Sequence, residues 1–341
     1  AIGTSKDKKA KDNGLQLDIE IKNQVKLMVK IIKIFLCSIC FLAILILSLF
    51  GYRDKPLEEL KAKYAPSPST FISVNGMDVH FRDEGDATDS IPIVLIHGTA
   101  ASLHTFNDWT EQLKQDYRIV RMDLPAYGLT GPFPDRDYSI DNYVDFIADF
   151  LDSLEIKKCV LGGNSLGGSI AWNFTSKYPE MVDKLILIDA SGYPSEAKSV
   201  PLAFRIAQIP LVKNIFTFIT PRFVVKASVE NVYADKTKIS EALVDRYFEL
   251  ALRKGNRQAF IDKFEAQTDL IAHNNIKLID QRTLILWGEK DLLIPVEEAY
   301  KFHRDLPNDT LVILSNVGHV PMEESPNQSL EAVLSFLKKD D

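Results

Sequence analysis

The stretch KKCVLGGNSLGGSIAW, residues 157–172, places Ser165 among four glycines. Glycine loses more backbone freedom on folding than any other residue, so a cluster of glycines needs a structural reason. A sharp turn from a strand into a helix strains the residue at its apex. Such a turn closes only when the residues two positions before and after the apex lack side chains. Gly163 and Gly167 hold those positions, so the stretch predicts a strand, a strained turn with Ser165 at its apex, and a helix.

Five other apolar runs resemble the one that precedes Ser165. They are IPIVLIHG (91–98), YRIVRMDLP (117–125), DKLILIDA (183–190), RTLILWGE (282–289) and DTLVILSN (309–316). Near-continuous apolar character is typical of strands that are covered on both faces. Amphipathic stretches such as residues 139–155 separate several runs, which predicts a mostly parallel sheet with right-handed helical crossovers. Ahead of these runs, Asn75-Gly76 between alternating residues predicts a β-hairpin.

One long interval contains no such run. Residues 193–276 read as several helices with no strand between them. An insertion of this size at the carboxyl edge of a parallel sheet is expected to form a cap over that edge. The Phe and Ile residues of the interval can form a small helical core, an apolar wall around a substrate, or both.

A serine nucleophile needs a base that takes its proton, and the base needs a carboxylate that orients it. His319 stands in the loop after the last apolar run, and Asp291 stands in the loop after the preceding one. Both loops would emerge at the edge of the sheet where Ser165 emerges, in the chain order Ser, Asp, His that is typical of hydrolases. The sequence therefore predicts a catalytic triad of Ser165, Asp291 and His319.

Other residues compete for these roles. Asp123 and Asp189 also end apolar runs, and Asp291 is preferred because it directly precedes the unit that carries the histidine. The histidines expected to be ordinary surface or packing residues are His80, His273 and His303.

The loop that begins with His97 and Gly98 is predicted to supply the oxyanion hole. It ends the first parallel strand, so the backbone N–H of Thr99 can act together with the N–H of Leu166. His97 itself is expected to brace this loop rather than to transfer protons.

Composition argues against several functional classes. The chain has 341 residues, of which 46% are hydrophobic, and its net charge of -7 comes without a basic block, which argues against nucleic-acid binding. Cys37, Cys40 and Cys159 cannot build a disulfide or metal framework, and no two His or Cys residues lie at ligand spacing. We therefore expect neither a metal nor a cofactor.

An uncharged apolar run, residues 34–52, is long enough to cross a bilayer. A cleaved signal and a buried helix are the alternatives, but the run lacks a small-x-small cleavage pattern at its end. More lysines precede the span than basic residues closely follow it. The N-terminus is therefore expected in the cytoplasm and the rest of the chain on the other side of the membrane. We predict a basic cytoplasmic segment (1–33), a transmembrane helix (34–52), a linker (53–70) and a folded domain (71–341).

The segments LIHGTAAS, MDLPAYGLT, GGNSLGGS, LILIDASGYP, LILWGEKDLLIP and VGHVPMEESP resemble the α/β-hydrolase fold enzymes from about Phe71 to the end of the chain. The combination of GNSLGG, DASGYP and GLTGP is similar to bacterial lipases and esterases that are close relatives of the carbon–carbon bond hydrolases of aromatic degradation. One departure is Ala126, where relatives usually have glycine. A serine at the apex instead of an aspartate argues against epoxide hydrolases and haloalkane dehalogenases.

The resemblance implies Ser165 as nucleophile, His319 as base, Asp291 as acid, and Thr99 with Leu166 as oxyanion donors. It implies an enzyme that cleaves carboxylic esters, with lipophilic acyl esters as substrates. The alternatives are a carbon–carbon bond hydrolase of diketo acids that uses the same triad and a non-catalytic binding protein on the same fold. An anionic dienoate would need a positive group, for which the cap offers Arg205, Arg222, Arg253 and Arg257.

Overall fold

The computed structural model describes residues 3–194, 197–210, 212–266 and 272–338, in two compact units that meet between Gly51 and Tyr52. The first unit is one helix, α1 (Gly3–Phe50), which begins well before residue 34. Its part Gln16–Phe50 contains 18 consecutive residues with a mean hydropathy of 2.7 and is long and apolar enough to cross a membrane. By length and composition the helix is a candidate membrane span, but a signal sequence has the same properties.

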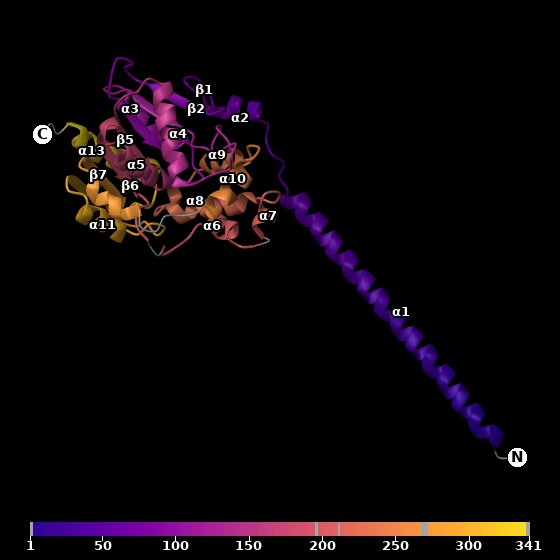
Figure 1. The fold of residues 1–341 in the computed structure, drawn as a ribbon. Helices are drawn as coiled ribbons and strands as arrows, with labels where there is room; N and C mark the ends of the chain where they lie inside the picture. Colours follow the sequence, from indigo (N-terminus) through magenta and orange to yellow (C-terminus); the bar gives the residue numbers. More distant parts are fainter. Residues whose placement is uncertain (1–2, 195–196, 211, 267–271, 339–341) are drawn as a thin grey trace. The chain divides into compact units, whose positions relative to one another are not determined.

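The second unit is built on one sheet of eight strands (Figure 1), in the order β1-β2-β4-β3-β5-β6-β7-β8. The strands are β1 (Thr70–Val74), β2 (Met77–Glu84), β3 (Ile93–Ile96), β4 (Ile119–Met122), β5 (Cys159–Asn164), β6 (Val182–Ile188), β7 (Arg282–Gly288) and β8 (Asp309–Leu314). All neighbours among β3 to β8 are parallel, whereas β1 with β2 and β2 with β4 are antiparallel. Each predicted apolar run overlaps one of the six parallel strands, which confirms the predicted mostly parallel sheet.

The predicted hairpin joins β1 to β2, with Val74 opposite Met77 in the register. Asn75 and Gly76 have φ values of 51° and 77°, in the left-handed region that Asn-Gly turns adopt.

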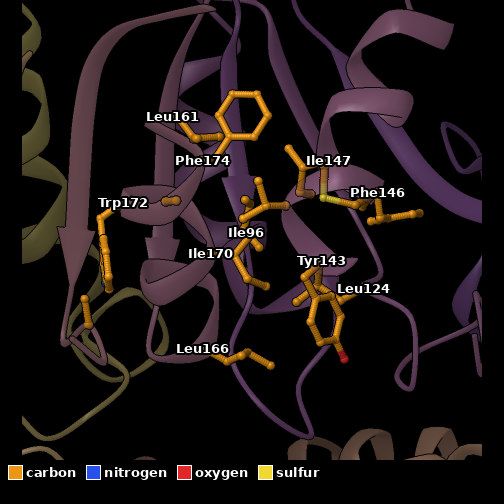
Figure 2. Close-up of a cluster of buried hydrophobic side chains, with 14 of the residues drawn as sticks. Ile96, Leu124, Tyr143, Phe146, Ile147, Leu161, Leu166, Ile170, Trp172 and Phe174 are labelled. Atoms are coloured by element: carbon orange, nitrogen blue, oxygen red, sulfur yellow. The ribbon is translucent and has the colours of Figure 1, made fainter. Parts of the chain in front are cut away.

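Helices cover both faces of the sheet. One face carries α4 (Ile140–Ser153), α5 (Leu166–Lys177) and α11 (Glu297–Asp305), and the other carries α3 (Asn107–Leu113) and α13 (Pro326–Lys338). Because side chains alternate along a strand, Ile96 packs with the first group and Leu95 with the second. Figure 2 shows the first core, in which Phe146 of α4 and Phe174 of α5 lie with Ile96. Burial raises the pKa of the Cys159 thiol on β5 to about 12.

The described residues between β6 and β7 form helices and contain no strand. We call this segment the cap; its α-helices are α6 (Leu202–Ala207), α7 (Val212–Phe216), α8 (Arg222–Val232), α9 (Glu241–Ala251) and α10 (Asn256–Glu265). Short 3-10 helices, η3 (Lys236–Lys238) and η4 (Ala272–Leu278), complete it. Figure 1 shows the cap helices gathered beside one another.

Residues 52–69, ahead of the sheet, pack on the cap. The Lys55 N–H donates to the Leu252 carbonyl at 2.8 Å, and α2 (Leu57–Tyr64) lies next to α9. The Tyr64 hydroxyl donates to Glu249 at 2.5 Å, and Leu60 is buried against Leu250. This segment therefore belongs to the second unit and fixes one side of the cap.

Candidate active site

Ser165 lies at the apex of the turn between β5 and α5, with φ 55° and ψ -115°. Left-handed φ values strain a residue other than glycine, and the surrounding hydrogen bonds hold this one. The Ser165 N–H donates to Ile188 at 3.0 Å, and the Ser165 carbonyl accepts from Ser191 at 3.1 Å. A Cβ on Gly163 would collide with the Gly167 backbone, and a Cβ on Gly167 would collide with the Ile96 carbonyl. The turn therefore closes only with glycine on both sides of the serine.

Asp291 and His319 are brought together from the loops after β7 and β8. His319 Nδ1 lies 2.6 Å from Asp291 Oδ2, and both side chains are buried. The other carboxylate oxygen, Oδ1, accepts from the N–H groups of Leu293 at 2.8 Å and Ile294 at 3.0 Å. These bonds hold the carboxylate, so Nδ1 of His319 carries the proton and Nε2 remains free to accept another.

Two residues that the sequence analysis did not single out join the histidine loop to its surroundings. Asn164, just before the apex, donates through Nδ2 to the carbonyl of His319 at 3.0 Å. Glu324 is 2% exposed and accepts the Gly318 N–H at 2.7 Å and the Asp235 N–H of the cap at 2.7 Å. Both residues lie inside the segments that carry the family resemblance, so their position in these segments could have identified them as candidates.

Asp189, the first competitor for the acid role, lies beside Asp291. Its Oδ1 accepts the Gly288 N–H at 2.9 Å, and its side chain is fully buried. Burial, reinforced by the neighbouring Asp291 carboxylate, raises the pKa of Asp189 well above its ordinary value, which favours the protonated carboxyl. Ligand atoms of Asp189, Asp291 and His319 lie within 4.8 Å of one another. The close Asp291–His319 bond and the backbone donors explain this cluster without a metal ion.

Asp123, the second competitor for the acid role, stabilises the loop after β4. Its carboxylate accepts from His80 Nδ1 at 2.7 Å and from the N–H groups of Leu103 at 2.8 Å and Leu129 at 2.7 Å. Burial alone would raise the pKa of Asp123, but the charge of His80 and its hydrogen bond lower it below the ordinary value. Asp123 and His80 therefore organise the loop after β4 and lie apart from the Asp291–His319 pair.

The loop after β3 lies against the serine turn. A Cβ on Gly98 would stand 3.1 Å from the Cβ of Ser165, so Gly98 permits this close approach. His97 Nδ1 donates to the Gly98 carbonyl at 2.8 Å, and Nε2 accepts the Leu124 N–H at 2.9 Å. Burial lowers the pKa of His97, which leaves the ring uncharged in this bracing position. Thr99 follows in the same loop, and Leu166 is the first residue of α5.

A mostly apolar cavity of about 830 Å³, its open mouth included, adjoins this loop. Thr99 lines it on the sheet side, and Phe204, Phe216 and Phe260 line it on the cap side. Ala126 also lines the cavity and has φ 84°, which explains why glycine is the usual residue there. The pocket therefore lies between the predicted oxyanion loop and the cap.

Residues 91–326 match the family model described as alpha/beta hydrolase fold, and the chain belongs to this family. The predicted fold class is thereby confirmed.

The relatives of this chain are hydrolases of more than one kind. It is 30% identical to YugF of Bacillus subtilis (strain 168), an uncharacterised hydrolase, over 80% of this chain and 99% of that one. It is 28% identical to a 2-hydroxy-6-oxo-6-(2'-aminophenyl)hexa-2,4-dienoic acid hydrolase of Metapseudomonas resinovorans, over 79% and 90% of the two chains. It is also 28% identical to Lipase 3 of Moraxella sp. (strain TA144), over 74% and 79%. The chain is thus a hydrolase whose relatives include a lipase and a dienoic acid hydrolase.

Proposed function

We propose that the protein is a membrane-anchored serine esterase or lipase that cleaves lipophilic carboxylic esters. The observation that carries this proposal is the strained Ser165 at the β5–α5 turn. The neighbouring Asn164 donates to the carbonyl of His319, and His319 is paired with Asp291. The apolar cavity beside Thr99 supports a lipophilic substrate, because ligand pockets of this kind bury most of the ligand surface.

In the proposed reaction, Ser165 Oγ attacks the ester carbonyl carbon while His319 Nε2 accepts the hydroxyl proton. Asp291 keeps the imidazole in the required tautomer. The N–H groups of Thr99 and Leu166 stabilise the tetrahedral oxyanion, each contributing on the order of 10²-fold or more in rate. The C–O bond then breaks, the alcohol leaves with the proton from His319, and water releases the acid in the same way. These steps require no cofactor.

The proposed location follows from α1. An anchor formed by residues 34–52, with the lysines ahead of it in the cytoplasm, puts the hydrolase unit on the extracytoplasmic side. The competing possibility is a signal sequence. N-terminal mass analysis of protein from membrane and soluble fractions separates the two, because a cleaved signal would yield a soluble chain that begins after residue 52.

A carbon–carbon bond hydrolase is the second candidate, and the similarity to the Metapseudomonas enzyme favours it. Its anionic substrate would need a positive group in the pocket. Arg205 is exposed, Arg222 pairs with Asp245 on the cap surface, and Arg253 donates to the Leu129 and Thr130 carbonyls. Arg257 is the one that lines the cavity. Strong dienoate turnover without any turnover of nitrophenyl esters would replace our proposal with this one.

Labelling with a fluorophosphonate probe separates an enzyme from a non-catalytic protein of the same fold. An activated serine reacts with the probe, so we expect one adduct, at Ser165, in a tryptic mass spectrum. Boiled protein serves as the control. Native protein that stays unlabelled at Ser165 would contradict the proposed enzyme.

Asp189→Asn is expected to leave ester turnover within a few fold of wild type. Asparagine keeps an oxygen for the Gly288 N–H and, like the protonated Asp189, is uncharged. The unfolded chain releases the Asp189 proton above about pH 4 whereas the folded chain, in which the pKa is raised, retains it to a higher pH, so this group lowers stability as the pH rises. Urea unfolding near about pH 5 and about pH 8 should show a smaller loss of stability in the variant than in wild type. A large drop in turnover would instead give Asp189 a direct catalytic part.

A further inference from the structure

The cavity wall contains a buried charge that the proposed reaction does not use. Arg257 on α10 is 6% exposed and lines the cavity. Among the described residues that line it, Arg257 is the only charged one. The same cavity reaches Thr99, whose loop lies against Ser165. Under the proposed function, a substrate held at the serine would extend past this loop into the space that Arg257 borders.

Few groups accept hydrogen bonds from the Arg257 guanidinium. Its Nη2 donates to Asp54 Oδ1 at 2.7 Å, and its Nη1 lies 3.4 Å from the Thr220 hydroxyl, a long hydrogen bond. Its Nε has no hydrogen-bond partner in the described part of the chain. Leaving a buried donor without an acceptor is unfavourable, so the Asp54 carboxylate is the main partner that stabilises this guanidinium.

Asp54 comes from outside the sheet and the cap, from the segment that packs on the cap. The ring of Tyr52 packs edge to face on Phe248 at 4.9 Å, and the Lys55 backbone is bonded to Leu252. Contacts with the cap on both sides of Asp54 in the chain therefore fix its position. Its side chain is 42% exposed whereas that of Arg257 is 7% exposed, so water supports the carboxylate while the guanidinium depends on its partner.

We propose that Arg257 and Asp54 form an ion pair that selects substrates by charge. Asp54 balances the positive charge of the wall, so the cavity accepts esters that are uncharged beyond the reacting carbonyl and discriminates against esters that carry a second carboxylate. A carboxylate entering the cavity would lose its hydration without gaining a net attraction. An uncharged acceptor, such as a second ester carbonyl, bonds to Arg257 at no such cost. This inference rests on the proposed ester hydrolysis.

Two esters of matched length test the inference on the full-length protein in detergent. The p-nitrophenyl ester of hexanoic acid ends in a methyl group, and the mono-p-nitrophenyl ester of adipic acid ends in a carboxylate on the same chain length. The readout is the ratio of kcat/KM for the adipate ester to that for the hexanoate ester. Asp54→Asn leaves Arg257 uncompensated and is expected to raise the ratio about tenfold or more, which equals about 1.4 kcal/mol. Arg257→Gln leaves Asp54 uncompensated and is expected to lower it.

The controls separate local charge from net charge and from misfolding. Asp245→Asn breaks the Arg222–Asp245 pair on the cap surface and changes the net charge by the same amount, so the ratio should stay at the wild-type value. Fluorophosphonate labelling verifies that each variant keeps a folded active site. Arg257→Gln removes a buried charge, so it provides a test even where Asp54→Asn fails to fold.

The outcomes distinguish the inference from the function on which it rests. Normal hexanoate turnover with an unchanged ratio in the folded variants would overturn the charge selection and leave the esterase intact. Wild-type protein that hydrolyses neither ester would contradict the proposed function, and the inference would fall with it.

Discussion

Replacement of Ser165 by alanine is expected to lower kcat for nitrophenyl esters by on the order of 10⁴ to 10⁶-fold. The hydroxyl is the proposed nucleophile, and members of such a unit act together, so removal of one removes almost the whole acceleration. The loss is chemical and not structural, because the Ser165 bonds to Ile188 and Ser191 are made by its backbone. Initial rates and fluorophosphonate labelling, measured on protein of unchanged circular dichroism, check this expectation.

The matched control is Ser169→Ala. Ser169 lies one turn further along α5 and is also buried, at 8% exposed. It has no part in the proposed chemistry, so turnover within a few fold of wild type is expected. If Ser165→Ala kept a rate comparable to that of Ser169→Ala, another residue would be the nucleophile.

Asp291→Asn is expected to lower kcat by about 10⁴-fold at neutral pH. The amide oxygen can still accept the Leu293 and Ile294 N–H groups, so the loop after β7 should keep its shape. The amide NH₂ group, however, is a donor and would face Nδ1 of His319, which favours the tautomer with the proton on Nε2. Such a histidine cannot accept the serine proton. Steady-state kinetics together with a melting temperature close to that of wild type would show this pattern.

Asp189→Asn, described above, is the isosteric control for this variant, because Asp189 is buried beside Asp291 and burial raises its pKa. The two substitutions should differ by several orders of magnitude in kcat. Near-normal turnover by Asp291→Asn would move the acid role to Asp189 or Asp123.

Much of the fold follows from local patterns in the sequence. A run such as RTLILWGE becomes β7 because its side chains must be buried on both faces, and the stretch 139–155 contains α4 because one of its faces is apolar. Local patterns cannot give the order in which strands pair. The placement of β4 between β2 and β3 depends on contacts between residues distant along the chain.

The hydropathy of the N-terminal part had a similar limit. Hydropathy predicts a span at residues 34–52 because these residues are uncharged. A helix, however, continues wherever backbone propensity allows, and α1 begins at Gly3. Side-chain polarity sets where an apolar segment begins, whereas backbone propensity sets where a helix begins, so the two boundaries need not coincide.

The candidate site divides in the same way. The sequence predicts Ser165, Asp291 and His319 as a triad because each follows an apolar strand in a recognisable position. Of these three, the structure brings Asp291 and His319 into contact. The Asp54–Arg257 pair joins residues 203 positions apart, and neither residue stands in a motif. Pairs of this kind become visible only when the chain is folded, since many other carboxylates could have served the same arginine.

The burial of Cys159 gives the protein a practical property. Cys37 and Cys40 are exposed on α1, whereas Cys159 lies inside the sheet with a thiol that stays protonated at neutral pH. A maleimide dye or a nitroxide spin label that reacts with the protein before it enters a bilayer would therefore attach to α1 and leave the hydrolase unit unmodified. The unaltered chain thus carries its own reporter positions, from which fluorescence quenching or electron paramagnetic resonance can test whether α1 enters a bilayer.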